Sequence, residues 1–165
     1  MPKEYLGKTK NGFAVYLDTE SSHALTHFAN HSNLRGLVEK AIPTIDGVME
    51  VVRVERDMGE IIGASDLVET NELDEIVYAK RPLRTGYSRF VKNRESVSTS
   101  WITIDLRKSG EKEYSLYTAF IGRLTPSFPG GNYLPEQSRE FWSKHALVWG
   151  GQEVVPGSET TRCPW

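Results

Sequence analysis

Residues 99–121 carry the pattern that most restricts the fold of this chain. Apolar side chains alternate with polar or aromatic ones over residues 99–107, and again over residues 113–121. A period of two sends successive side chains to opposite faces of a strand, and Ser109-Gly110 between the runs is typical of a hairpin turn. We therefore expect two antiparallel strands here, in the middle of a sheet.

Three weaker strand patterns accompany this hairpin, at residues 13–18, 48–55 and 75–81. Asp46-Gly47 is a turn signal directly before the second of them. Residues 123–137 are rich in Pro and Gly, which indicates a loop.

Residues 24–42 follow a helical period instead. One face of the expected helix holds Ala24, His27, His31, Leu34, Val38 and Ala41. Pro43 ends the pattern, and either Ser32-Asn33 or Gly36 is expected to divide it into two pieces. A second, shorter helix is expected to begin at Ser138 and to bury Phe141, Trp142, His145, Ala146 and Trp149. The order of elements predicts an α+β fold, with N-terminal helices packed on a twisted antiparallel sheet of about four strands and a short C-terminal helix.

The size and composition favour one domain. The chain has 165 residues, of which 38% are hydrophobic, and 4 Trp, 7 Tyr and 6 Phe supply large core side chains. We expect a single domain over residues 1–151 and a flexible tail over residues 152–165. Cys163 is the only cysteine, so no intrachain disulfide is expected. No signal peptide or membrane-spanning run is visible, which favours a cytoplasmic protein, with delivery into another cell as an open alternative.

Charge is unevenly distributed along the chain. The formal net charge is −2, yet residues 55–76 hold eight acids and one base, whereas residues 80–94 hold six bases and no acid. Tyr87 and Phe90 lie among those bases. Basic residues interleaved with aromatic ones are typical of a surface that grips a phosphodiester and stacks on an unpaired base. The alternative is that the acidic and basic runs neutralise each other on a solvated surface.

The N-terminal histidines are the best candidates for acid–base chemistry. His23, His27 and His31 are spaced so that a continuous helix would align them. An imidazole titrates near neutral pH and can act as general acid or base. One alternative is that these histidines pack at the edge of the core. Another is a zinc site, for which the sequence shows no obvious third ligand nearby.

Several short strings together resemble one family. They are Ile76-Val77-Tyr78-Ala79-Lys80-Arg81, Tyr87-Ser88-Arg89-Phe90-Val91-Lys92, Tyr117-Thr118-Ala119-Phe120-Ile121-Gly122 and Phe141-Trp142-Ser143-Lys144-His145-Ala146-Leu147. With the expected layout of residues 20–150, this pattern resembles the metal-independent ribonuclease superfamily that includes barnase, EndoU-like, colicin-tRNase-like and RelE-like toxins. The resemblance implies cleavage of RNA by attack of the 2′-hydroxyl on the adjacent phosphorus, with no cofactor and no metal.

The candidate site residues follow from that chemistry, which needs a base, an acid and cations. The expected catalytic residues are His27, His31, Lys80, Arg81, Arg84, Arg89 and Thr118. The expected substrate-binding residues are Tyr87, Phe90, Lys92, Arg94 and His145. The expected partner is RNA, with tRNA as one candidate, together with an inhibitor or immunity protein, and no membrane. The alternatives are a non-catalytic module that binds a protein or an anionic partner, and an accessory protein of a phage or mobile element.

Overall fold

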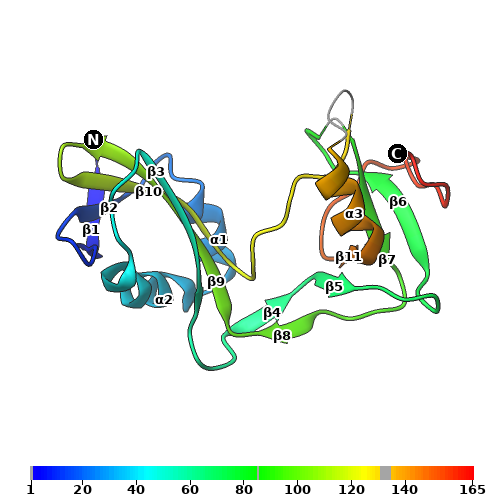
Figure 1. Cartoon of the computed structure of the whole chain (residues 1–165), viewed down its shortest axis with the longest axis horizontal. Helices are drawn as coiled ribbons and strands as arrows, with labels where there is room; N and C mark the ends of the chain where they lie inside the picture. Colours follow the sequence, from blue (N-terminus) through cyan, green and yellow to red (C-terminus); the bar gives the residue numbers. More distant parts are fainter. Residues whose placement is uncertain (1, 85, 131–134) are drawn as a thin grey trace. The chain divides into compact units, whose positions relative to one another are not determined.

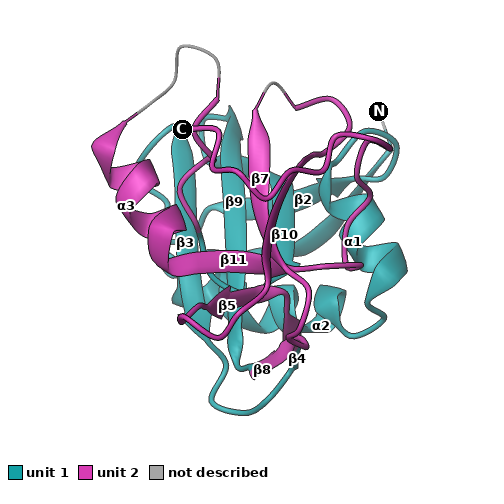
Figure 2. Cartoon of the chain, turned by 90° about the vertical axis from the view of Figure 1, so that its right-hand side faces the viewer, with its two compact units in different colours: residues 1–63, 99–124 teal, residues 64–98, 125–165 magenta. Residues whose placement is uncertain are grey.

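The computed structural model describes residues 2–84, 86–130 and 135–165. The chain forms two compact units, each built from two separate segments (Figure 2). Unit 1 consists of residues 1–63 and 99–124, and unit 2 of residues 64–98 and 125–165. The chain passes between the units within β4 (Gly63–Ser65) and β8 (Val97–Thr99), which pair as a two-stranded sheet.

Unit 1 contains a five-stranded sheet in the order β1-β2-β10-β9-β3 (Figure 1). Its strands are β1 (Lys3–Lys8), β2 (Ala14–Asp18), β3 (Val51–Asp57), β9 (Trp101–Gly110) and β10 (Glu113–Ile121). Strand β9 lies antiparallel to both β3 and β10, whereas β2 runs parallel to β10 over only three residues of each strand. The remaining length of β10 is free of β2, and α1 (Ala24–Asn30) packs against β10.

The helices of unit 1 cover one face of that sheet. Helix α2 (Leu34–Ala41) follows α1 and continues into a 3₁₀ turn at Ile42–Thr44. The buried face contains Val15, Leu17, Leu34, Val38, Ile104, Leu106 and Leu116. Alternation along β9 places Thr103 and Asp105 on the opposite face of the sheet.

Unit 2 contains a four-stranded sheet in the order β5-β11-β7-β6. The strands are β5 (Leu67–Glu69), β6 (Ile76–Lys80), β7 (Tyr87–Val91) and β11 (His145–Val148), and α3 (Glu136–Lys144) leads directly into β11. One face buries Val77, Ala79 and Phe90 against Trp142, and the other buries Val68, Val91 and Ala146. Near the end of the chain, Thr160 exchanges two backbone hydrogen bonds with Tyr78 of β6.

The predicted fold class is wrong. Over the described residues, the chain forms eleven strands in three sheets and only three short α-helices, instead of N-terminal helices on one sheet of about four strands. Residues 145–148 show one reason. They continue a helical pattern in sequence, but they pair with β5 on one side and β7 on the other, so tertiary pairing overrides the local preference.

No α-helix in the described part of the chain is long and apolar enough to cross a membrane.

Candidate functional site

The polar face of the unit 1 sheet is organised around one buried carboxylate. The Asp105 side chain is only 1% exposed, whereas the two arginines that hold it, Arg53 and Arg107, are 51% and 41% exposed. Arg53 donates from Nε to Oδ2 at 2.9 Å, and Arg107 donates from Nε to Oδ1 at 3.0 Å. These contacts fix the position of each guanidinium. Both arginines contact Asp105 through Nε and Nη2, and neither contacts it through Nη1.

Arg107 also lies over an aromatic ring. Its guanidinium carbon is 3.8 Å from the centroid of the Tyr117 ring. The His23 ring stacks on the same tyrosine, with the two centroids 4.7 Å apart. Tyr117 lies where the register between β9 and β10 shifts by one residue, which is a β-bulge. Such bulges redirect side chains and are common next to active sites.

A hydrogen bond fixes the start of α1 beside this tyrosine. The Ser22 hydroxyl donates to the Leu116 carbonyl at 2.7 Å and accepts from the Ala24 amide at 3.2 Å. The first turn of α1 is therefore tied to β10. We call Arg53, Asp105, Arg107, Tyr117 and His23 the Asp105 cluster.

The electrostatics of the Asp105 cluster favour an anionic ligand. Two guanidinium groups and one carboxylate leave a net charge of about +1 before His23 is counted. The hydrogen bond from Arg107 to Asp105 raises the pKa of that arginine, so it stays charged at every physiological pH. A rigid, charged fork suits the oxygen atoms of a phosphate group.

Three of the predicted catalytic residues lie in unit 1. Thr118 is the cross-strand partner of Asp105, so it shares the face of the Asp105 cluster. His27 lies one helical turn after His23, with its ring 6.0 Å from the Phe120 ring, and desolvation lowers the pKa of His27. His31 follows the end of α1 and its Nε2 is 3.1 Å from the Ile62 carbonyl oxygen. Because Nε2 must donate in that contact, the neutral ring keeps an acceptor at Nδ1, which is buried and unpaired in the described structure.

The predicted basic cradle belongs to unit 2, where its side chains have internal partners. Arg81 donates to Ser88 and Gln152 and lies over the Phe128 ring. Burial and the nearby charge of Arg84 lower the pKa of Arg81 to about 10, so Arg81 still carries its charge at neutral pH. The ammonium group of Lys80 lies 5.3 Å from the centroid of the Tyr87 ring, and Arg84 is exposed.

Arg89 and His145 are brought together, but as a structural pair. Arg89 donates to the hydroxyl of Thr70 at 2.9 Å and to the backbone carbonyl of His145 at 3.0 Å. The His145 ring stacks on Phe141 and bonds the Phe141 carbonyl through Nδ1. Both residues thereby join β7 to the junction of α3 and β11.

The remaining predicted substrate contacts are also engaged within unit 2. Phe90 is fully buried against Trp149, so its ring is not available to a base arriving from solvent. Arg94 pairs with Asp74 at 3.2 Å, and Lys92 pairs with Glu159 at 3.5 Å. The structure thus places His27 and His31 with Thr118 in unit 1, and the predicted basic residues with His145 in unit 2.

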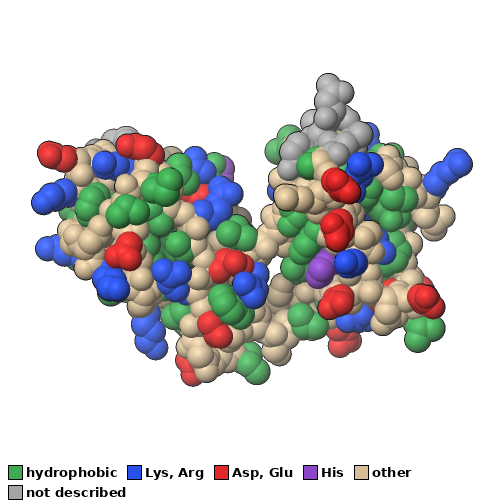
Figure 3. All heavy atoms as spheres, viewed as in Figure 1, with side chains coloured by type: hydrophobic (Ala, Val, Ile, Leu, Met, Phe, Trp, Pro, Cys, Tyr) green, Lys and Arg blue, Asp and Glu red, His purple; other side chains and the backbone are tan. Residues whose placement is uncertain are grey.

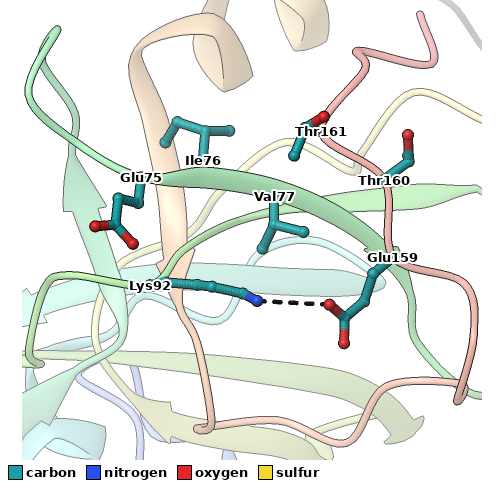
Figure 4. A pocket seen from close by; sticks show the side chains of 7 residues that line it. All are labelled: Glu75, Ile76, Val77, Lys92, Glu159, Thr160 and Thr161. Carbon is teal, nitrogen blue, oxygen red and sulfur yellow. Dashed lines mark hydrogen bonds and ion pairs between the residues drawn. The ribbon is translucent and has the colours of Figure 1, made fainter.

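A pocket of about 530 Å³ lies beside β6 in unit 2 (Figure 4). The Lys92–Glu159 ion pair crosses its mouth. Its lining consists of Glu75, Ile76, Val77, Lys92, Glu159, Thr160 and Thr161. With its one lysine already paired and two glutamates beside it, this pocket is a poorer site for an anion than the Asp105 cluster.

The face drawn in Figure 3 carries charged side chains of both signs. In the view of Figure 3, Lys and Arg side chains are interspersed with Asp and Glu side chains over both units. Local arrangement therefore matters more here than the charge of a segment.

None of the five members of the Asp105 cluster was among the expected site residues, although His23 was considered together with the other N-terminal histidines. A signal for them does exist in the sequence. Asp105 is an acid in the middle of the strongest strand pattern, two residues before an arginine. A charged residue at the centre of a buried strand needs a partner, which points to a functional or structural ion pair. No family model, curated protein or solved structure matches the chain.

Proposed function

We propose that this protein is a metal-independent endoribonuclease whose active site is the Asp105 cluster of unit 1, with His27 and Thr118 beside it. One observation carries the proposal. Arg107, fixed by Asp105, lies on Tyr117, and the same ring stacks on His23. The Arg107 guanidinium, which we assign to phosphate binding, and the His23 imidazole therefore contact the same tyrosine ring.

The proposed reaction is a transesterification. A base removes the proton from the 2′-hydroxyl, and the resulting oxygen attacks the adjacent phosphorus. The bond from phosphorus to the 5′-oxygen then breaks, and an acid protonates that oxygen. The products are a 2′,3′-cyclic phosphate and a free 5′-hydroxyl, so no further reactant is needed.

His27 of α1 and His23, which directly precedes α1, divide the proton transfers. Desolvation lowers the pKa of His27, which keeps its ring neutral at pH 7 and suits the role of base. His23, one turn earlier and stacked above Tyr117, serves as the acid. Arg53 and Arg107 stabilise the charge that develops on the phosphorane oxygens, and the Thr118 hydroxyl donates a further hydrogen bond.

The test is cleavage of total tRNA and of a defined single-stranded RNA in the presence of EDTA. Wild-type protein should produce 2′,3′-cyclic phosphate ends. His23→Ala and Arg107→Ala should each lower kcat/KM about 100-fold or more, since positioned acid–base and electrostatic groups contribute that much. Arg35→Ala is the matched control, because Arg35 of α2 pairs with Glu4 of β1 and Glu39 of α2, outside the cluster. Its kcat/KM should equal that of the wild type.

The pH dependence gives an independent check on His27. The rate should fall as the pH drops through the lowered pKa of His27, because the base becomes protonated. His27→Ala should lose that acidic limb along with most of its activity. RNA that stays intact at stoichiometric protein would refute the proposal, and binding without cleavage would favour the non-catalytic module instead.

A further inference from the structure

The polar face of the unit 1 sheet repeats one arrangement in three places. In each, a cationic side chain lies over an aromatic ring and is held there by a carboxylate. The first consists of Asp105, Arg107 and Tyr117. The other two lie outside the Asp105 cluster.

The second arrangement lies at the start of β9. The Arg123 guanidinium carbon is 4.0 Å from the centroid of the Trp101 ring, and Arg123 pairs with Glu55 at 3.0 Å. Glu55 also accepts from the Leu124 amide at 2.9 Å, so the carboxylate is itself held. The Arg123 side chain is 53% exposed to solvent, although it lies over the Trp101 ring.

The third arrangement lies on β1 and β2. The Lys3 ammonium is 4.2 Å from the centroid of the Tyr16 ring and 3.1 Å from a carboxylate oxygen of Glu113. Tyr16 is in register with Ser115, which is in register with Arg107. Cross-strand partners share a face, so Tyr16 lies on the same face as the Asp105 cluster.

Six cation–aromatic pairs occur among the described residues. Three of them share the polar face of the unit 1 sheet, each with its cation paired to a carboxylate. A guanidinium already held beside a ring by a carboxylate loses little freedom when a base stacks on it.

The spacing fits a single strand of nucleic acid. Trp101 and Arg107 are six residues apart on β9, which is about 20 Å. A stacked strand rises about 3.4 Å per nucleotide, so this span matches about six nucleotides, or fewer in an extended strand. Bases in a duplex are already stacked and paired, so only unpaired bases can reach such platforms.

We propose that Trp101–Arg123 and Tyr16–Lys3 are base-stacking subsites that bind unpaired nucleotides on either side of the Asp105 cluster, and that the substrate is single-stranded RNA of several nucleotides. That the bound strand is cleaved rests on the proposed function; that it is bound does not. The binding experiment therefore uses 2′-O-methyl RNA, which cannot undergo 2′-hydroxyl attack.

The experiment measures the Kd of fluorescent 2′-O-methyl oligonucleotides of three and nine nucleotides, single-stranded and as duplexes, with the full chain. The single-stranded 9-mer should bind at least tenfold more tightly than the 3-mer and than the duplex. Trp101→Leu should weaken 9-mer binding at least fivefold, whereas Trp101→Phe, which keeps an aromatic ring, should restore most of it. Arg123→Ala should weaken binding similarly, and Arg35→Ala, which also removes a glutamate-paired arginine of unit 1, should not.

Equal Kd values for the two lengths, or for Trp101→Leu and wild type, would overturn the proposed subsites. The outcome is separate from that of the cleavage assay. Length-dependent binding without cleavage of ordinary RNA would keep the subsites and refute the nuclease. Cleavage of ordinary RNA with no effect of Trp101→Leu on Kd would keep the nuclease and refute the subsites. Thermal melts of each variant establish that the fold is retained.

Discussion

Asp105 shows how much one residue can organise on a sheet face. A carboxylate that is almost fully buried is tolerable only when its charge is compensated, and here Arg53 and Arg107 approach it from two directions. The same contacts give both arginines a defined position at the surface. The stability of the sheet and the geometry of the candidate site therefore depend on the same side chain.

Asp105→Asn should reduce both the stability of the sheet and the activity of the candidate site. An amide cannot accept both arginines with a full negative charge, but the arginines are half exposed and water can replace part of the loss. We expect a decrease of about 1–3 kcal/mol in the free energy of unfolding, measured by urea denaturation, and a loss of RNA cleavage. Asp46→Asn, an exposed change between the 3₁₀ turn and β3, should leave the unfolding midpoint unchanged. A variant Asp105→Asn as stable as the wild type would contradict the assigned ion pairs.

Two glycines give a sharper test of packing in unit 1. A Cβ atom at Gly47 would lie 2.6 Å from the ring of Tyr114, which is fully buried and whose hydroxyl donates to the Met49 carbonyl. Gly47→Ala should therefore destabilise the protein by about 1–3 kcal/mol. A Cβ atom at Gly36 on α2 meets nothing within 4 Å, so Gly36→Ala should stabilise by up to about 1 kcal/mol. Opposite shifts in melting temperature are the expected readout, and equal shifts would contradict this packing.

At the scale of elements, the sequence predicts those whose pattern is local. The hairpin at 99–121 is confirmed as β9 and β10, and the divided helix at 24–42 is confirmed as α1 and α2, separated near Ser32-Asn33. Strands β1, β7, β8 and β11 were not predicted. Short strands carry too little alternation to be recognised, and their identity is decided by partners distant in sequence.

The candidate site was only partly predictable for the same reason. His27 and Thr118 were identified from residue type and position. The Asp105 cluster, however, depends on the register between β3, β9 and β10, and on a bulge at Tyr117. The basic run at 80–94 lies outside unit 1, and charge along a segment does not show which side chains are already engaged: Arg81, Arg89 and Arg94 all have internal partners.

The attachment of α1 to β10 is a property of the element that can be tested through Ser22. Its hydroxyl is the hydrogen bond donor to the Leu116 carbonyl, at the point where His23 stacks on Tyr117. Ser22→Ala should lower the free energy of unfolding by about 1 kcal/mol and lower kcat about tenfold or more, because His23 loses its fixed position. Ser21→Ala removes only an exposed hydrogen bond to Asp18 and should keep kcat. Equal kcat values for the two variants would show that this contact does not position His23.

At the scale of the whole molecule, a segment of unit 2 is inserted between the two segments of unit 1. Residues 64–98 leave unit 1 after β4 and return at β8, and residues 125–165 complete unit 2. Each unit has its own buried cluster. The composition of the sequence does not change where the chain passes from one unit to the other. The acidic run at 55–76, for example, extends across the first boundary, after Gly63.

The arrangement predicts that unit 1 folds and acts without unit 2. Its two segments meet where the Ile62 amide donates to the Thr99 carbonyl at 2.9 Å, so a short Gly/Ser linker can join Gly63 to Thr99 in a chain that ends at Leu124. The shortened chain keeps the five-stranded sheet, both N-terminal helices and every residue of the Asp105 cluster. We expect one cooperative thermal transition by circular dichroism, and RNA cleavage that is again lost in His23→Ala. A cooperatively folded chain that binds RNA but no longer cleaves it would place an essential catalytic group in unit 2, among the basic residues of β6 and β7. A chain that does not fold would show that the core of unit 1 is not sufficient by itself.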